Sequence, residues 1–145
     1  MTTKLMQSSV VIVGGGPVGA TLALTLQHYG IPVTMLEARA KGAAYHDRRA
    51  LALSYGSRRI LEKLGVWQHL DAQATAINTI HISQRGSLGR SLLKAQEHNL
   101  PALGYVLSYG ALTQALDEAL AKFDGVRTLY EAEATYIEPG SEHAS

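Results

Sequence analysis

Hydrophobic residues near the start of the chain change their spacing twice, from strand-like to helical and back. Val10–Val13 is apolar at every position, which predicts a strand covered on both faces. From about Pro17 to Tyr29 the apolar residues recur at helical spacing, and Gly30 is expected to end that helix. The helix face expected to pack on the sheet consists of Val18, Leu22, Leu26 and Tyr29. Ile31–Glu37 is strand-like again, so the pattern predicts a βαβ unit with parallel strands.

Helical spacing returns after a loop of small and polar residues. Ser54 is expected to cap a helix that runs through Leu64 and ends at Gly65. Its inward-facing residues are expected to be Ile60, Leu61 and Leu64. Trp67–Ala76 is predicted to form a shorter helix, anchored by its tryptophan and by Leu70.

Alternation replaces helical spacing in the next segment. Ile77–Arg85 alternates, with Ile80 and Ile82 on one face. Turn residues around Gly86 follow, and Leu92-Leu93 is expected to lie on a returning strand. An antiparallel hairpin placed after βαβ material indicates the edge of a second, sheet-based subdomain.

The last third of the chain carries one clear helix between strand signals. Ala111–Phe123 has apolar residues at helical spacing, and Asp124-Gly125 is expected to end it. Its inward face is expected to hold Leu112, Ala115, Leu116, Ala119, Leu120 and Phe123. Val126–Tyr130 is predicted to be a core strand and Ala134–Ile137 the start of another. Together these patterns predict an α/β fold with a Rossmann-like βαβ domain.

Composition narrows the classes of function. The chain has 145 residues, of which 46% are hydrophobic, enough for the core of about one domain. A net charge of +1 without a basic run gives no reason to expect nucleic-acid binding. The chain contains no cysteine, and its six histidines lack close ligand spacing with carboxylates, so no metal site is expected. No apolar segment approaches the roughly 20 residues of a membrane-spanning helix.

The glycines between the first strand and the first helix are predicted to bind a ligand. Gly14, Gly16 and Gly19 have the spacing of a phosphate-binding turn. Gly14 can adopt the angles of a tight turn, Gly16 leaves room for a pyrophosphate, and Gly19 lets the helix lie close to the strand. Pro17 suits the first helical turn, since its missing N–H would have no helical partner there. The N–H groups and dipole of that helix then face the phosphates.

Glu37 stands at the tip of the second strand, 18 positions after Gly19. A carboxylate there can accept both hydrogen bonds of an adenosine ribose and would repel a 2′-phosphate. The predicted ligand is therefore FAD or NAD, with NADP disfavoured. The alternative is a glycine-rich turn in an ordinary α/β domain, which the flanking strands, helix and acid make less favourable.

Several stretches together resemble the N-terminal part of the FAD-dependent aromatic hydroxylases. They are Val-Ile-Val-Gly-Gly-Gly-Pro-Val-Gly at 11–19, Glu37, Asp-Arg-Arg-Ala-Leu-Ala-Leu-Ser at 47–54, and Leu-Gly-Tyr-Val at 103–106. The first motif is shared by many flavoproteins, whereas the block at 47–54 is far more specific. The chain is most similar to the ubiquinone-biosynthesis hydroxylases, which act on polyprenylated phenols, and the resemblance covers nearly all of residues 8–137.

The resemblance implies roles for individual residues. The three motif glycines would hold the FAD pyrophosphate and Glu37 the adenosine ribose. Arg49 would lie near the FAD, the alternative being a solvated surface arginine. Ser108 falls where the family often has a longer polar side chain at the flavin, and capping of the following helix is an equal alternative. No side-chain nucleophile is expected, because the cofactor carries the reaction.

The family's reaction is monooxygenation of an electron-rich ring, with FAD as cofactor and NAD(P)H as reductant. The chain is therefore expected to divide into four parts. Residues 1–76 form the FAD-binding βαβ portion and 77–100 a hairpin of the substrate subdomain. Residues 101–138 return to the FAD-binding domain, and 139–145 form a polar tail. Family members run to several hundred residues, and their second FAD motif lies downstream. The resemblance therefore implies an N-terminal fragment that alone holds the ADP half of FAD and is inactive.

The expected partner is an aromatic small molecule, and the protein is expected in the cytoplasm. Peripheral association with the inner membrane or with a biosynthetic complex is left open, as is the oligomeric state. Two alternatives are another FAD oxidoreductase, such as an oxidase or halogenase, and a dinucleotide-binding module without catalysis. Binding of ADP or NAD without any flavin would favour the module.

Overall fold

The computed structural model describes residues 10–83, 86 and 89–140, which fall into two compact units. One unit holds residues up to Ala44 and from Leu116 onward, and the other holds Tyr45–Ala115. This division follows contacts between residues, whereas the boundaries expected at 76, 100 and 138 follow the type of element. Most of the polar tail expected at 139–145 lies outside the described residues.

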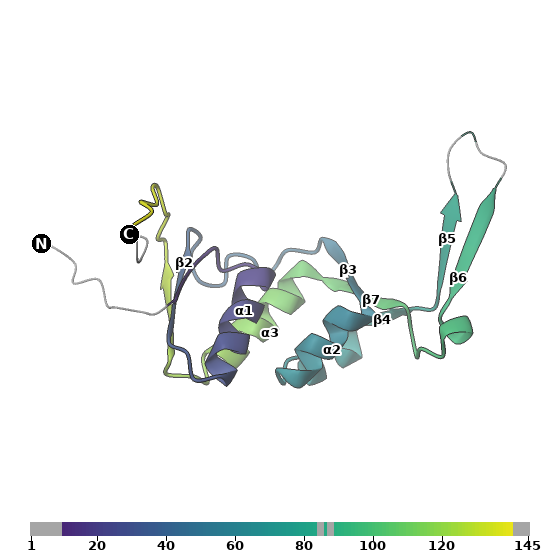
Figure 1. The fold of residues 1–145 in the computed structure, drawn as a ribbon, viewed down its shortest axis with the longest axis horizontal. Coiled ribbons are helices and arrows are strands. Elements are labelled where there is room, and N and C mark those ends of the chain that lie inside the picture. Colours follow the sequence, from purple (N-terminus) through teal and green to yellow (C-terminus); the bar gives the residue numbers. More distant parts are fainter. Residues whose placement is uncertain (1–9, 84–85, 87–88, 141–145) are drawn as a thin grey trace, which may run out of the picture. The chain divides into compact units, whose positions relative to one another are not determined.

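The first unit is built on a parallel sheet of three strands in the order β1-β2-β8. Its central strand, β2, is labelled in Figure 1. The strands are β1 (Val10–Val13), β2 (Val33–Glu37) and β8 (Val126–Tyr130). Val10 pairs with Val33, and Val33 pairs with Val126, so the three strands run in register. The βαβ unit and the core strand at 126–130 predicted from the sequence are confirmed. The carboxyl ends of the strands meet at one edge of the sheet, which positions Glu37 there.

Helix α1 (Pro17–His28) connects β1 to β2, with Tyr29 as its C-cap residue and Gly30 in the left-handed region at φ +69°. Its extent agrees with the prediction, but its predicted inward face is wrong. The side chains that it buries are Ala20, Ala23 and Leu24. Val18 is 86% exposed and Tyr29 75% exposed. Two of the three buried side chains are alanines, which allow a close approach to the sheet, whereas the bulkier Val18 and Leu22 are exposed.

Strand β1 departs from the expectation that both of its faces are covered. Ile12 is buried, whereas Val11 and Val13 are 56% and 55% exposed. The strand lies at the edge of the described sheet, and nothing among the described residues buries its second face. A uniformly apolar strand indicates which residues can be buried on both faces, but not which polypeptide covers them.

The second unit contains an antiparallel sheet that the sequence did not indicate. It consists of β3 (Ala50–Ser54), β7 (Gly104–Ser108) and β4 (Thr75–Ile77), in the order β3-β7-β4. Strand β3 pairs with β7 over five residues, from the pair Ala50 and Ser108 to the pair Ser54 and Gly104. Sequence reasoning missed β3 because alternating alanine and leucine fit a strand or a helix equally well at this length.

Helix α2 (Tyr55–Lys63) starts as predicted, with the Ser54 Oγ accepting a hydrogen bond from the Ser57 N–H at 3.0 Å. Gly65 follows it in the left-handed region at φ +71°. Leu61 is buried as expected, but the expectation for Ile60 is wrong, because 51% of that residue is exposed.

The single helix predicted for Trp67–Ala76 is wrong. Two short 3₁₀ helices, η1 (Trp67–His69) and η2 (Asp71–Gln73), occupy the segment, and β4 follows. Trp67 and Leu70 are nonetheless buried anchors, as expected. The tryptophan Nε1–H donates to the Asp71 carboxylate at 2.9 Å, which ties the two turns together. Only these two large apolar side chains hold the segment, too few for a longer amphipathic helix.

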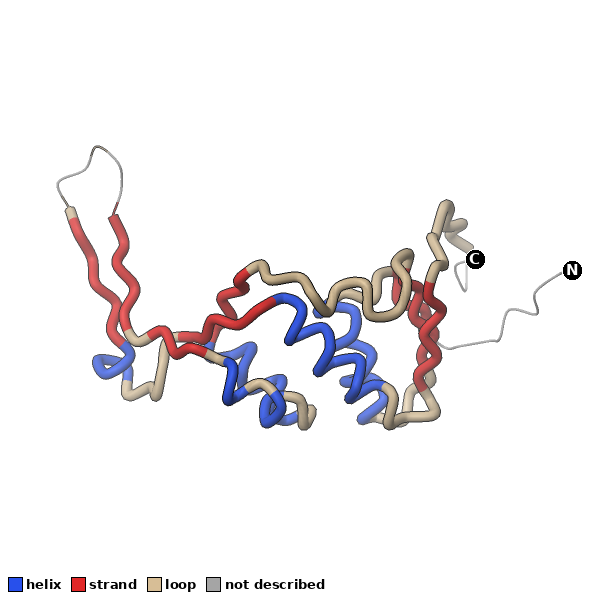
Figure 2. Tube along the Cα trace, turned by 180° about the vertical axis from the view of Figure 1, so that it is seen from behind, coloured by secondary structure: helices blue, strands red, loops and turns tan. Residues whose placement is uncertain are grey.

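The predicted hairpin is confirmed as β5 (Thr79–Ser83) paired antiparallel with β6 (Arg90–Lys94), two neighbouring strands in Figure 2. Thr79 pairs with Lys94 and Ser83 with Arg90. A 3₁₀ helix, η3 (Ala95–His98), follows β6. Part of the turn, at 84–85 and 87–88, lies outside the described residues.

Helix α3 (Tyr109–Leu120) begins two residues before the predicted helix and buries the expected apolar face. Phe123 is the exception, because it follows the end of the helix and is 41% exposed. The strand predicted to begin at Ala134–Ile137 is wrong: the segment has no regular structure, and Ile137 is 56% exposed. Within the described part of the chain, no helix has the length and apolar character needed to cross a membrane.

Candidate functional site

The glycine turn after β1 has the backbone geometry expected of it. Gly14 has φ +104°, a value that residues with a side chain rarely adopt. Its N–H donates to the Leu36 carbonyl at 2.8 Å, which joins the turn to the end of β2. The turn is therefore held against the carboxyl edge of the sheet.

Gly19 sets how closely α1 approaches this turn. A Cβ atom at this position would collide with the Gly14 carbonyl oxygen and would lie 3.2 Å from Cγ2 of Ile12. The structure thus confirms that this glycine permits close packing of helix on strand. Gly16 is the N-cap residue and supplies no side-chain cap, and Pro17 opens the helix. The first N–H groups of a helix have no partner within it, so this end offers donors and the positive end of the helix dipole.

Glu37 ends β2 and points to the glycine turn. The residue is 8% exposed, and its Oε2 accepts a hydrogen bond from the Gly15 N–H at 2.9 Å. A Cβ atom on Gly15 would lie 2.9 Å from the Glu37 Cβ. Sequence reasoning did not select Gly15, because it occupies the variable position of the motif. The run of three consecutive glycines was the available signal.

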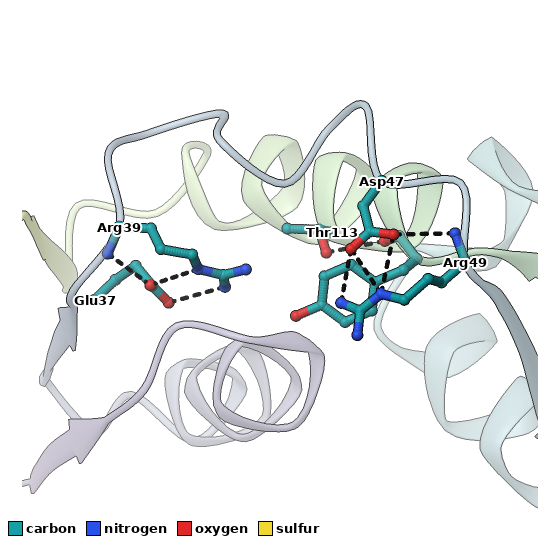
Figure 3. Close-up of polar contacts among 6 residues, drawn as sticks. Glu37, Arg39, Asp47, Arg49 and Thr113 are labelled. Carbon is teal, nitrogen blue, oxygen red and sulfur yellow. Dashed lines mark hydrogen bonds and ion pairs between the residues drawn. The ribbon is translucent and has the colours of Figure 1, made fainter.

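Arg39 is a second residue that sequence reasoning missed. Its Nε donates to Oε1 of Glu37 at 2.8 Å, and its Nη2 donates to Oε2 at 3.2 Å (Figure 3). Its backbone N–H donates to the same Oε1 at 2.9 Å. The side-chain hydrogen bond from Arg39 is the largest influence on the pKa of Glu37, which lies below its ordinary value of 4.5 although burial opposes this shift. A cation two positions after the strand-end acid was the signal for this pair.

Arg49 belongs to a second ionic cluster, in the other unit. Its Nη2 donates to Oδ2 of Asp47 at 2.6 Å, and its Nε donates to the same oxygen at 2.9 Å (Figure 3). The guanidinium carbon lies 4.9 Å from the centre of the Tyr109 ring, a cation–π distance. The arginine side chain is 71% exposed. The structure therefore presents a guanidinium that is both oriented and accessible.

Ser108 caps helix α3, which was one of its two expected roles. Its Oγ accepts a hydrogen bond from the Ala111 N–H at 3.2 Å. The next residue, Tyr109, donates its N–H to the Arg49 carbonyl at 2.8 Å. The pairing of β3 with β7 thus brings Ser108 and Arg49 together. Capping uses a lone pair of the hydroxyl oxygen and leaves its hydrogen for another acceptor.

The residues of the first cluster fit the ADP portion of a dinucleotide. Gly19 lets α1 lie directly against the glycine turn, the start of α1 offers donors, and Glu37 offers a carboxylate against the same turn. In the other unit, Arg49 offers a cation that suits an anionic group. No group of histidines and carboxylates suited to a metal ion occurs among residues 10–83, 86 and 89–140.

Comparison with known sequences gives a family match over most of the chain. The profile described as "FAD binding domain" matches residues 7–142. The 3-demethoxyubiquinol 3-hydroxylase of Escherichia coli is 35% identical over 118 residues, which cover 78% of this chain and 30% of that enzyme. The ubiquinone hydroxylase UbiL of Rhodospirillum rubrum is 31% identical over 133 residues, covering 90% and 31%. The chain thus spans about a third of the length of the curated relatives that it matches.

Comparison with solved structures finds similarity to a flavin-dependent monooxygenase. The flavin-dependent monooxygenase PieE, determined in complex with FAD and substrate, superposes with a TM-score of 0.74 at 25% identity. The match covers 93% of this chain and 25% of PieE.

Proposed function

We propose a function from the premise that this chain belongs to the FAD binding domain family: it binds the ADP portion of FAD in a monooxygenase that hydroxylates a polyprenylated phenol. The observation that carries the proposal is the contact between the Glu37 carboxylate and the Gly15 N–H, at 2.9 Å. This contact holds an acceptor for ribose beside a turn and a helix end that suit a diphosphate.

The residues proposed to hold FAD each have a separate task. Gly14 and Gly16 shape the turn around the pyrophosphate, and Gly19 keeps α1 close to it. Pro17 starts the helix without adding an N–H that would need a partner. Glu37 accepts the hydrogen bonds of the adenosine ribose.

Arg49 and Ser108 are the candidates in the second unit. We propose that the guanidinium of Arg49 lies near an anionic part of FAD, oriented by Asp47 and by the Tyr109 ring. Ser108 would contribute its hydroxyl hydrogen, since its oxygen already caps α3. When bound, FAD supplies the oxygen-transfer chemistry, with NAD(P)H as reductant.

The substrate class rests on what the relatives are called. Two of them are a 3-demethoxyubiquinol 3-hydroxylase and a ubiquinone hydroxylase. These names support a phenolic ring with a polyprenyl tail and a step of ubiquinone biosynthesis. Because such a tail partitions into lipid, we also propose that the protein associates peripherally with the inner membrane from the cytoplasm.

Deletion of the gene that encodes the chain tests the proposed activity. We expect lipid extracts of the deletion strain, analysed by mass spectrometry, to accumulate a polyprenylated phenol that lacks one ring oxygen. Re-expression of the unaltered gene should remove the intermediate, whereas a Gly16→Val gene should not, because the valine side chain would occupy the space of the pyrophosphate. An unchanged quinone profile in the deletion strain would overturn the hydroxylase proposal.

A further inference from the structure

The carboxylate of Glu37 has no acceptor position left. Oε1 accepts hydrogen bonds from the backbone N–H and the Nε of Arg39, at 2.9 and 2.8 Å. Oε2 accepts from the Gly15 N–H and from Nη2 of Arg39, at 2.9 and 3.2 Å. A carboxylate offers about four lone-pair sites. An adenosine ribose donates two hydroxyl hydrogens, so it can bind this carboxylate only if two of the four present donors leave.

The two backbone donors are fixed by the fold. Gly15 follows a turn residue whose N–H is bonded to the Leu36 carbonyl at 2.8 Å. The Arg39 carbonyl accepts a hydrogen bond from the Glu131 N–H at 3.3 Å, which holds the backbone on that side. The guanidinium is different, because it stands at the end of a long side chain that is 43% exposed, against 10% for the carboxylate. The side chain of Arg39 is therefore the group that can move.

We propose that the guanidinium of Arg39 is a built-in competitor of the adenosine ribose for Glu37, and that ribose binding displaces it. The inference rests on the proposed function. The exchange replaces the bonds from Nε and Nη2 with bonds from the two ribose hydroxyls, so the number of hydrogen bonds to the carboxylate is conserved. Before the ligand arrives, the arginine compensates a nearly buried negative charge. After exchange, the hydroxyls and the backbone donors satisfy it.

Competition by Arg39 makes affinity depend on the ribose diol in a specific way. A ligand with both hydroxyls must break the two guanidinium bonds, and part of its binding free energy is lost in doing so. A ligand without them, such as 2′,3′-dideoxy-ADP, has no bond to offer Glu37 and leaves the arginine in place. Removal of the guanidinium should therefore favour ADP and not dideoxy-ADP.

Isothermal titration of the 145-residue chain with the two nucleotides tests this dependence. The variant is Arg39→Ala, and the matched control is Lys41→Ala, which removes an exposed positive charge from the same loop. Relative to the control, Arg39→Ala should bind ADP about two- to fivefold more tightly, the range expected for loss of a partly exposed ion pair. For dideoxy-ADP the two variants should have equal affinities. An ADP affinity equal to or weaker than that of the control, or the same gain for both nucleotides, would overturn the inference.

NMR of the wild-type chain gives a second measurement that needs no variant to fold. The Nε–H resonance of Arg39 should shift and exchange faster with water when ADP saturates the protein, and should stay unchanged with dideoxy-ADP. If the resonance stays unchanged when ADP saturates the protein, the proposed displacement of Arg39 is wrong, although the chain still binds nucleotide. If the wild-type chain and both variants fail to bind ADP, the proposed function fails, and the inference fails with it.

Discussion

At the scale of single residues, Glu37 is an ionised group in a nearly dry position, stabilised by donors from Gly15 and Arg39. Its pKa is lowered in the folded chain, so its contribution to stability is fully present above the ordinary value of 4.5 and is lost as the pH falls through the lower, folded value. We expect Glu37→Gln to reduce the free energy of unfolding by about 1–3 kcal/mol at neutral pH.

The loss should shrink towards zero once the pH is low enough to protonate the wild-type carboxylate, as measured by urea unfolding across an acidic series. Glu62→Gln is the control, because Glu62 pairs with Arg58 at the surface and is 52% exposed. We expect its effect to stay within about 0.5 kcal/mol at every pH. An equal loss for Glu37→Gln at neutral and acidic pH would contradict the assigned role of its charge.

The site residues divide into those that sequence can identify and those that it cannot. Gly14, Gly19 and Glu37 are predictable, because a left-handed turn, a close helix and a strand-end acid each demand a residue type at a fixed spacing. Gly15 and Arg39 are not, because their importance lies in which donor meets which carboxylate oxygen. That pairing depends on side-chain rotamers and backbone direction, which spacing does not encode.

At the scale of elements, α1 illustrates the limit of hydrophobic periodicity. Its bounds follow from proline and glycine signals, but its buried face holds two alanines and Leu24, while Val18 and Leu22 are exposed. The spacing of large apolar residues predicts that the bulkiest side chains face the sheet. The distance between α1 and the sheet, however, is set by the absence of a side chain at Gly19. Strand β3 was missed for a related reason, since only its pairing with β7 separates it from a helix.

The close approach of α1 can be tested with a pair of glycine substitutions in first helical turns. We expect Gly19→Ala to lower the free energy of unfolding by about 3 kcal/mol, because its methyl group meets a backbone carbonyl that cannot rotate away. Gly56→Ala in α2 is the control, since its methyl group would lie 3.6 Å from the Ser54 Oγ, an ordinary contact. It should be neutral or stabilise by up to about 1 kcal/mol in urea unfolding. Equal effects of the two substitutions would disprove the packing argument.

At the scale of the whole molecule, the resemblance to FAD-dependent hydroxylases is confirmed by the family match and by the ubiquinone hydroxylases among the relatives. The α/β class with a parallel sheet and a separate antiparallel hairpin is confirmed as well. The sequence did not predict that one face of β1 is uncovered: Val11 and Val13 are more than half exposed in this chain. An apolar pattern records what a strand tolerates, whereas burial depends on all the polypeptide around it.

The candidate contacts also predict which part of FAD this chain recognises. The glycine turn, the start of α1 and Glu37 address the ribose and diphosphate, groups that ADP and FAD share. We therefore expect the chain to bind ADP and FAD with affinities within about threefold of each other, a difference of less than about 1 kcal/mol. AMP, which lacks the second phosphate, should bind more weakly than either in the same calorimetric titration. If FAD binds more than about tenfold more tightly than ADP, the chain must also contact the flavin half of the cofactor. The accessible guanidinium of Arg49 would then be the first group to substitute.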